Sequence, residues 1–159
     1  MTSTEWLSAE EMSAWRKFVA VVELLPGTLD AQLQRDADLS HFEYFVMAML
    51  SETPGHSLRM TQLSIETDTT LPRLSHLVAR LEKRGYVTRT PCVEDRRATN
   101  ATLTTSGWEK VMAAAPGHVG AVRHNVIDPL DARDVADLDR IMGRMLGRLE
   151  PGGRVGAPR

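Results

Sequence analysis

The chain has 159 residues and a mass of 17.7 kDa, enough for one compact domain or two small lobes with a hydrophobic core. Hydrophobic residues make up 42% and charged residues 25% of the chain, a composition that excludes disorder of the whole protein. The single cysteine, Cys92, excludes an intramolecular disulfide framework and a cysteine-rich zinc site, and the net charge of −2 does not indicate a globally basic protein.

Several features predict a cytoplasmic protein without membrane contact. A single cysteine suits a reducing compartment. The first residues, MTSTEWLSAEEMS, are polar and acidic, so we expect no signal peptide. The longest apolar stretch, residues 18–25, contains Glu23 and is too short to cross a bilayer.

Charge is unevenly distributed along the chain. Residues 1–55 carry three basic and nine acidic side chains, whereas residues 69–97 carry seven basic and three acidic ones. A local basic patch on a nearly neutral protein favours a surface that binds a polyanion. A solvated helix face beside a charged turn would give the same pattern.

The first predicted helix covers residues 11–36. An apolar stripe runs from Trp15 to Leu33 at helical spacing. Pro26-Gly27 interrupts this stripe, which predicts a kink or a break.

A second helix is predicted from Ser40 to Glu52. Ser40 and Glu43 have the spacing of a capping box, in which each side chain bonds the main chain of the other residue. Leu39 and Tyr44 are placed to form a hydrophobic staple around it. A Pro-Gly pair just beyond Glu52 predicts the end of the helix.

Two more helices follow. A short one is predicted from Thr61, its candidate N-cap, to Thr67. The next begins at Leu71, with Pro72 in the first turn, and ends before Gly85, a residue suited to a helix C-terminus. The predicted buried face of the helix that begins at Leu71 comprises Leu71, Leu74, Val78 and Leu81.

A β-hairpin is predicted next, with strands at residues 86–90 and 99–103 around a polar tip. The order helix, short helix, helix and hairpin describes a winged helix-turn-helix over residues 38–104. The predicted fold class is therefore mainly α-helical with a small β-hairpin wing.

The remaining helices are predicted at residues 104–126, with a kink at Pro116-Gly117, and at residues 131–149. Apolar residues of the last helix step by three and four, as in a seam that packs on another helix. They are Val135, Leu138, Met142, Met145 and Leu149. We therefore expect residues 1–37 and 105–150 to form a helical dimerisation region, with a disordered tail at residues 151–159.

Basic side chains follow one face of the helix that begins at Leu71. The stripe comprises Arg73, His76, Arg80 and Lys83. It is offset from the leucine stripe by about 200°, so the leucines can be buried while the cations face outward. Arg73 is placed to bind guanine in the major groove, where such a contact discriminates by ~1–3 kcal/mol, and Arg80 and Lys83 are placed to bind phosphates. An ordinary amphipathic helix is the alternative interpretation.

The hairpin tip, Asp95-Arg96-Arg97, places a carboxylate beside two guanidinium groups. An arginine inserted into a narrow minor groove reads DNA shape. A neighbouring carboxylate that orders this arginine reduces the roughly 2 kcal/mol of rotamer entropy lost on insertion. A charged turn with a weak surface ion pair is the alternative. The candidate DNA-binding residues are Thr69, Thr70, Pro72, Arg73, Ser75, His76, Arg80, Lys83, Asp95, Arg96 and Arg97.

The segments 91–97 and 103–108, which follow the helix ending before Gly85, resemble the MarR family of bacterial transcription regulators. The similarity runs from about residue 15 to residue 149. Further segments resemble the actinobacterial branch of this family: residues 58–60, 73–76 and 115–119.

The resemblance implies an obligate homodimer in which the terminal helices interlock and each subunit presents one winged helix. It also implies that Arg97 is the minor-groove arginine, that Asp95 anchors it, and that Arg73 and His76 reach bases. Members of the family bind small, often aromatic or phenolic, anions between the dimer region and the DNA-binding region. No motif in this sequence identifies such a ligand.

We therefore expect a dimeric regulator of a pseudo-palindromic operator on double-stranded DNA, most simply a repressor released by a small effector. An activator, or a regulator without a ligand, fits the sequence equally well. The alternatives from other classes are a winged-helix module that binds only proteins and a small enzyme that uses His118. The common motifs of hydrolases, zinc proteases and nucleotide-binding proteins are missing from the sequence, so we expect no enzyme.

A few residues suggest other sites. Trp15, Trp108, Met112 and His118 are candidate lining residues of an effector pocket, with core packing as the alternative. Cys92 is a candidate redox sensor. His118 and His124 lack the spacing that brings two imidazoles together on a helix, so we expect no metal and no cofactor.

Overall fold

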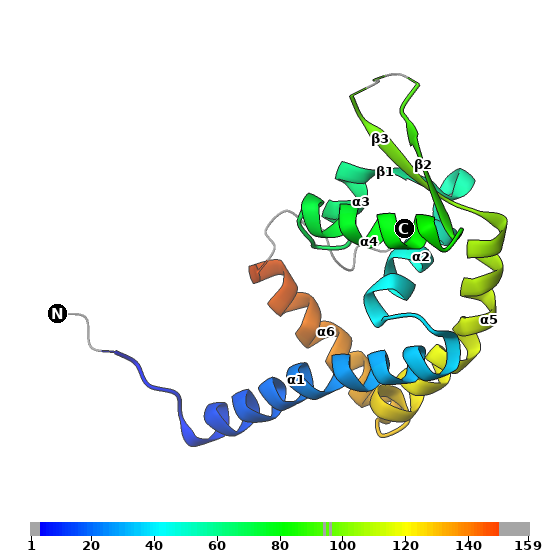
Figure 1. The fold of residues 1–159 in the computed structure, drawn as a ribbon. Coiled ribbons are helices and arrows are strands. Elements are labelled where there is room, and N and C mark those ends of the chain that lie inside the picture. Colours follow the sequence, from blue (N-terminus) through cyan, green and yellow to red (C-terminus); the bar gives the residue numbers. More distant parts are fainter. Residues whose placement is uncertain (1–3, 94, 96, 150–159) are drawn as a thin grey trace.

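The computed structural model describes residues 4–93, 95 and 97–149. Its elements are α1 (Ala9–Ala37), α2 (His41–Glu52), a 3-10 turn η1 (Pro54–His56), β1 (Ser57–Arg59), α3 (Met60–Glu66), α4 (Leu71–Lys83), β2 (Val87–Pro91), β3 (Thr99–Leu103), α5 (Thr105–Val122), a π-helical turn η2 (Arg123–Ile127) and α6 (Ala132–Leu149). The predicted fold class is confirmed. In Figure 1 the β2–β3 hairpin projects from a lobe that contains α3 and α4, while α1 extends away from that lobe. The tail predicted to be disordered lies outside the described residues.

The first helix starts earlier than predicted and is not broken. Ser8 and Glu11 form a capping box, with the Ser8 N–H donating to Glu11 Oε2 at 2.8 Å. The helix then continues through Pro26, so a break at Pro26-Gly27 is wrong. Pro26 removes the N–H that would bond the Val22 carbonyl, but Val22 is half exposed and water can bond that carbonyl instead.

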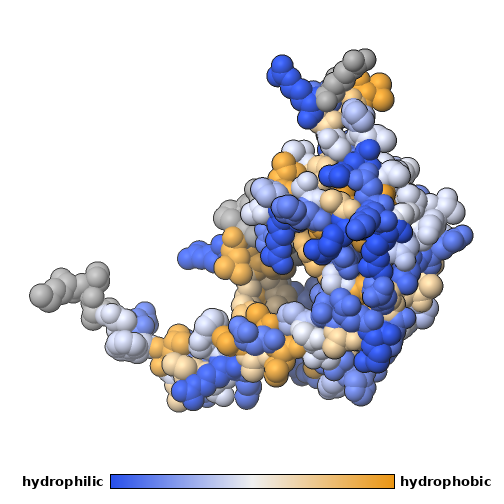
Figure 2. Space-filling model, viewed as in Figure 1, coloured by the Kyte–Doolittle hydropathy of each residue, from blue (hydrophilic) through white to orange (hydrophobic). Residues whose placement is uncertain are grey.

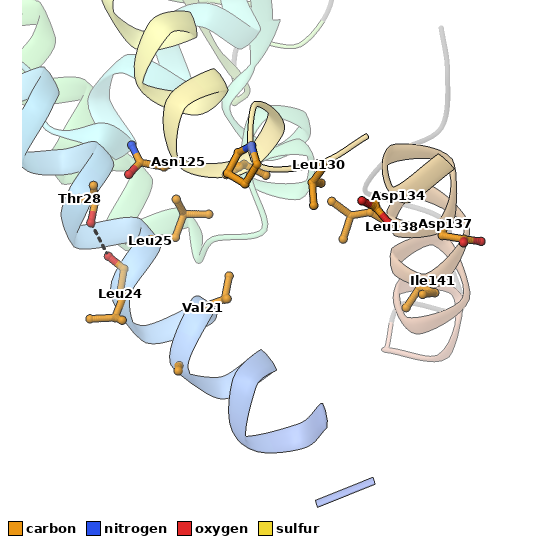
Figure 3. Close-up of a pocket in the computed structure, with 13 residues that line it drawn as sticks. Val21, Leu24, Leu25, Thr28, Asn125, Leu130, Asp134, Asp137, Leu138 and Ile141 are labelled. Carbon is orange, nitrogen blue, oxygen red and sulfur yellow. Dashed lines mark hydrogen bonds between the residues drawn. The ribbon is translucent and has the colours of Figure 1, made fainter. Parts of the chain in front are cut away.

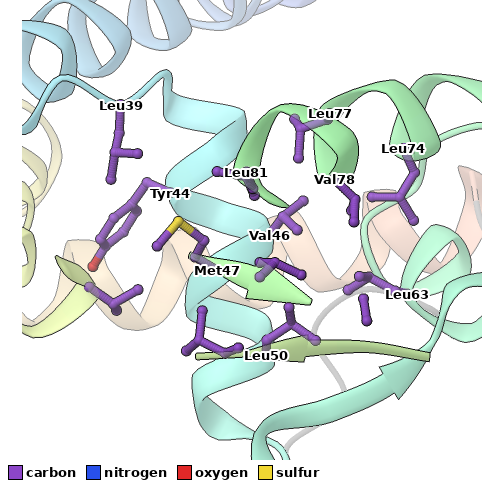
Figure 4. Close-up of a cluster of buried hydrophobic side chains, with 14 of the residues drawn as sticks. Leu39, Tyr44, Val46, Met47, Leu50, Leu63, Leu74, Leu77, Val78 and Leu81 are labelled. Carbon is purple, nitrogen blue, oxygen red and sulfur yellow. The ribbon is translucent and has the colours of Figure 1, made fainter. Parts of the chain in front are cut away.

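The second helix follows its local signals. Ser40 Oγ accepts from the Glu43 N–H at 3.1 Å, and Glu43 Oε2 accepts from the Ser40 N–H at 2.9 Å, so the predicted capping box is confirmed. Leu39 and Tyr44 are both buried in the central cluster of apolar side chains shown in Figure 4. This cluster joins α2 and α4 to the sheet.

The sheet has three strands in the order β1-β3-β2, all antiparallel. The strand β1 was not predicted, and its last residue, Arg59, pairs with Asn100 and is also the N-cap of α3. Thr61 is therefore not the N-cap, since the strand leads directly into the helix and the N-cap lies two residues earlier. The predicted strand at residues 99–103 is confirmed as β3.

The helix α4 has the predicted start and end. Pro72 lies in its first turn, and Gly85 has φ +79°. The Gly85 N–H donates to the Glu82 carbonyl, and the Tyr86 N–H to the Leu81 carbonyl, which together close the helix as a Schellman motif. The predicted buried face is wrong at one position. Leu71 is 43% exposed, because it lies in the first turn beside the hairpin, and Leu77 is buried instead.

The helix α5 is attached firmly to the hairpin lobe. Thr104 Oγ1 accepts from the Gly107 N–H and donates to the Gly85 carbonyl. Gly107 packs so closely that a Cβ there would clash with the Tyr86 carbonyl oxygen. The helix stays intact through Pro116, and its predicted end becomes the π-helical turn η2. These contacts join the start of α5 to the segment between α4 and β2.

Candidate nucleic-acid interface

The basic stripe of α4 faces away from the core. Arg73, His76, Arg80 and Lys83 are exposed, as are Thr70 and Pro72, whereas Thr69 and Ser75 are half-buried. The buried residues of the helix lie on its other side: Leu74, Leu77, Val78 and Leu81. Hydrophilic side chains gather over this region in Figure 2. The surface of α4 can therefore approach a polyanion without disturbing the core.

Arg73 is held in place by an aromatic ring. Its guanidinium carbon lies 5.3 Å from the centroid of the Phe42 ring on α2. Such a cation–π contact limits the conformations of an exposed arginine. Arg73 is thus partly ordered at the N-terminal end of α4, where a base contact was expected.

Arg80 has a partner that was not predicted. Its Nε lies 3.4 Å from Oε1 of Glu43, a buried carboxylate on α2, while 63% of the Arg80 side chain stays exposed. Sequence reasoning could not find this pair, because 37 residues separate its members and no local spacing joins them.

Asp95 accepts two main-chain hydrogen bonds at the tip of the hairpin. Asp95 Oδ1 accepts from the Arg97 N–H at 3.0 Å, and the Asp95 carbonyl accepts from the Ala98 N–H at 2.9 Å. We expected the Asp95 carboxylate to contact an arginine guanidinium group, but it accepts from the Arg97 peptide N–H instead. Asp95 therefore holds the main chain of Arg97 and not its side chain. Arg96 lies outside the described residues.

The β2–β3 hairpin and α4 adjoin one another. Arg97 and Ser75 both line a cavity of about 200 Å³ between the hairpin and the start of α4. On the hairpin's other strand, Arg89 binds Glu82 of α4 at 2.8 Å. Hydrogen bonds from Arg89 hold the pKa of the Glu82 carboxyl below its ordinary value. Arg89 was missed from the sequence, since its partner is visible only once the strand folds back along α4.

The four candidate pocket residues do not meet in one chain. Trp15 packs against Phe18, with ring centroids 6.2 Å apart. Gln32 of α1 adjoins Gly117, which precedes His118 in the chain. At 1.5 Å per residue, Gln32 lies about 25 Å from Trp15 along α1. Trp15 and His118 are therefore too far apart to line one small-molecule site within a chain. The other two candidates are partly exposed on α5: Trp108 and Met112.

His118 lies among aromatic rings. Its ring centroid is 4.6 Å from that of Tyr44 and 5.6 Å from that of His41. Burial, together with the nearby His41, lowers the pKa of His118. Burial also lowers the pKa of His41, although the Asp30 carboxylate opposes this change. Among the described residues, no three His, Cys, Asp or Glu side chains are placed to hold a metal ion.

Cys92 is buried at the root of the wing. Its Sγ lies 3.4 Å from a guanidinium nitrogen of Arg59, which donates to it. The redox role suggested for Cys92 stays a prediction.

Within the described part of the chain, no helix is long and apolar enough to cross a membrane.

The chain is similar to known regulators. A model described as MarR family matches residues 39–99. Sco3205, a MarR family transcriptional regulator from Streptomyces coelicolor solved in complex with DNA, is 43% identical, with a TM-score of 0.91 over 94% of each chain. AbsC from the same organism, also a MarR family transcriptional regulator, is 36% identical, with a TM-score of 0.89 over 93% of this chain and 99% of AbsC.

Curated relatives share a shorter region. The transcriptional regulator PapX of Escherichia coli is 35% identical over 43% of this chain and 42% of PapX. The repressor YetL of Bacillus subtilis is 29% identical over 57% of this chain and 56% of YetL. The chain thus spans about half the length of the curated relatives it matches. The match to Sco3205, however, covers nearly the whole fold at 43% identity, and the chain therefore belongs to the MarR family.

Proposed function

We propose that two copies of this chain form a dimer that binds a pseudo-palindromic site on double-stranded DNA and regulates transcription in the cytoplasm. The observation that carries this proposal is the shared cavity between Arg97 on the wing and Ser75 on α4, which puts both elements on one side of the lobe. The structure of Sco3205 in complex with DNA supports it.

Each element has a distinct part in the proposed complex. The helix α4 enters the major groove, with Arg73 and His76 at base edges and Lys83 at a phosphate. Arg97 inserts into the adjacent minor groove. A two-fold axis then sets half-sites about one helical turn, ~34 Å, apart.

A purely protein-binding module explains the geometry less well. The cores of protein–protein interfaces are depleted of charged residues, whereas the outward face of α4 carries Arg73, Arg80 and Lys83. An enzyme that uses His118 is disfavoured, because the similar proteins are named as transcriptional regulators. The choice between repressor and activator rests on where the operator lies, and we propose a repressor.

Selection of bound fragments from genomic DNA, followed by salt titration of the best fragment, tests DNA binding. With Arg80 and Lys83 at phosphates in each of two copies, log K should fall with log salt at a slope of roughly −4. Selection of a common inverted repeat is expected. A titration without salt dependence, or random fragments with no shared sequence, would contradict the proposal.

The dimer is proposed from the unpartnered apolar surface of the terminal helices. No residue of α6 is buried, although its apolar seam runs its full length. A groove of about 840 Å³ separates α6 from α1, with Val21 and Leu25 on one wall and Leu138 and Ile141 on the other (Figure 3). A second copy would cover both the seam and this groove.

We also propose that a small effector binds between the dimer helices and the DNA-binding lobe, beside Tyr44 and His118. Two buried atoms there, Gln32 Oε1 and His118 Nδ1, have no hydrogen-bond partner among the described residues. An unpaired buried acceptor costs about 1–3 kcal/mol, so a ligand with an O–H donor on an aromatic ring would suit this site. Such a ligand releases DNA if it favours a spacing of the two α4 helices that does not fit the operator.

A screen of phenolic compounds for release of operator DNA tests the effector site. We expect an active compound to work on the wild type and to fail on His118→Phe, which keeps an aromatic ring but lacks the Nδ1 acceptor. Release should weaken as pH falls well below 6.5, the ordinary imidazole pKa, because protonated His118 accepts no hydrogen bond. Equal release of the wild type and His118→Phe would place the effector elsewhere.

A further inference from the structure

The C-terminal half of α4 is fastened to the junction between α1 and α2. Arg84, just after α4, donates to the Asp38 carbonyl at 2.6 Å and to Asp38 Oδ2 at 3.0 Å. Asp38 is the C-cap of α1 and has φ +50°, a left-handed conformation uncommon for residues other than glycine. The position of α4 is therefore linked to the end of α1.

Glu43 lies at the centre of this contact. Its side chain is 8% exposed, and its two oxygens contact the N-cap of α2 and two arginines on and just after α4. Oε2 accepts from the Ser40 N–H at 2.9 Å and lies 3.7 Å from a guanidinium nitrogen of Arg84. Oε1 lies 3.4 Å from Nε of Arg80, one turn earlier on α4. A buried carboxylate is costly without such partners, so its position and those of both arginines depend on one another.

We propose that Glu43 is a positioning residue for DNA recognition: its carboxylate sets the angle of α4 against the α1–α2 junction by holding Arg80 and Arg84. This inference rests on the proposed binding of a specific operator. The neighbouring Phe42 contacts Arg73 at the other end of α4, so one turn of α2 contacts both ends of α4. Figure 4 shows α4 beside α2.

The expected consequence concerns specificity rather than general affinity for DNA. Non-specific binding depends on the number of cations near the phosphates, which Glu43 does not change. Specific binding requires both α4 helices of a dimer to meet base edges at one fixed spacing. A looser α4 would therefore lose operator affinity and keep its affinity for random DNA.

The test compares Glu43→Gln with Glu52→Gln by binding to operator and to random DNA. The glutamine at position 43 keeps an oxygen that can accept from the Ser40 N–H, so the cap is retained while the charge is lost. Glu52 is exposed at the end of the same helix and loses the same charge. We expect Glu43→Gln to bind operator about tenfold more weakly and random DNA within about twofold of the wild type, with Glu52→Gln near wild type on both.

A double-mutant cycle with Arg80→Gln shows whether Glu43 acts through Arg80. If it does, the losses of the two single variants do not add up in the combined variant, since both changes break the contact between Glu43 and Arg80. Additive losses, or identical behaviour of Glu43→Gln and Glu52→Gln, would overturn the inference. Failure of the wild type to prefer any operator would instead overturn the proposed function. If Glu43→Gln unfolds, Arg84→Lys tests the same clamp, because it keeps the charge but has one nitrogen where the guanidinium group places one on Asp38 and one beside Glu43.

Discussion

Replacing Arg97 with alanine is expected to reduce operator affinity by roughly 30- to 1,000-fold, corresponding to about 2–4 kcal/mol for the two wings of a dimer. The reason is geometric. Asp95 accepts hydrogen bonds from the N–H groups of Arg97 and Ala98, and these contacts hold the main chain of Arg97 in the wing. The measurement is an equilibrium binding titration on operator fragments that differ only in their flanks.

The loss should be greatest where the flanks are rich in A·T pairs, because their narrow minor groove attracts a guanidinium group. Two variants separate shape reading from plain charge. Arg97→Lys keeps the charge and should recover only part of the loss, whereas Asp95→Ala keeps the guanidinium group but frees the turn and should lose less than Arg97→Ala. An equal loss on all flanks would show that Arg97 contacts only phosphates.

Local signals predicted much of the fold. The capping box of Ser40 and Glu43 fixed the start of α2, and the Schellman motif at Gly85 fixed the end of α4. Both depend on residues within five positions of one another, which sequence spacing reveals. The box of Ser8 and Glu11 has the same form and was overlooked, so the predicted start of α1 was two residues late.

The features that sequence could not predict depend on contacts between distant segments. The strand β1 has three residues and exists because β3 pairs with it, so its own residues carry no clear pattern. The partners of the arginines have the same origin. Arg80 has the spacing of a phosphate ligand, but only the packing of α2 on α4 shows that it also binds Glu43. Residue type and spacing were thus enough to predict the candidate DNA-binding residues. The partners that hold their side chains could be identified only from the fold.

Substituting Leu138→Asp together with Met145→Asp is expected to convert the protein to a monomer and to abolish tight operator binding. Both side chains belong to the half-exposed seam of α6, and Leu138 also lines the groove facing α1. Two charges in each copy would have to be buried in the proposed interface without partners, at a cost of several kcal/mol for each. A monomer presents one α4 helix and loses the second half-site. Light scattering after gel filtration gives the mass, and a titration gives the affinity for the same sample.

The matched control is Ala136→Asp with Gly143→Asp, which adds the same two charges at the same seven-residue spacing. Both positions are exposed, and each is two residues from a seam position, about 200° around the helix. Apart from the adjacent residues and the backbone of the helix itself, no described atom lies within 4 Å of the position of a Cβ at Gly143, so the control should fold, dimerise and bind. If α6 has no partner in solution, the two double variants will behave alike. A monomeric Leu138→Asp, Met145→Asp protein that still bound the full palindrome tightly would show that the pairing of two reading helices does not depend on this seam.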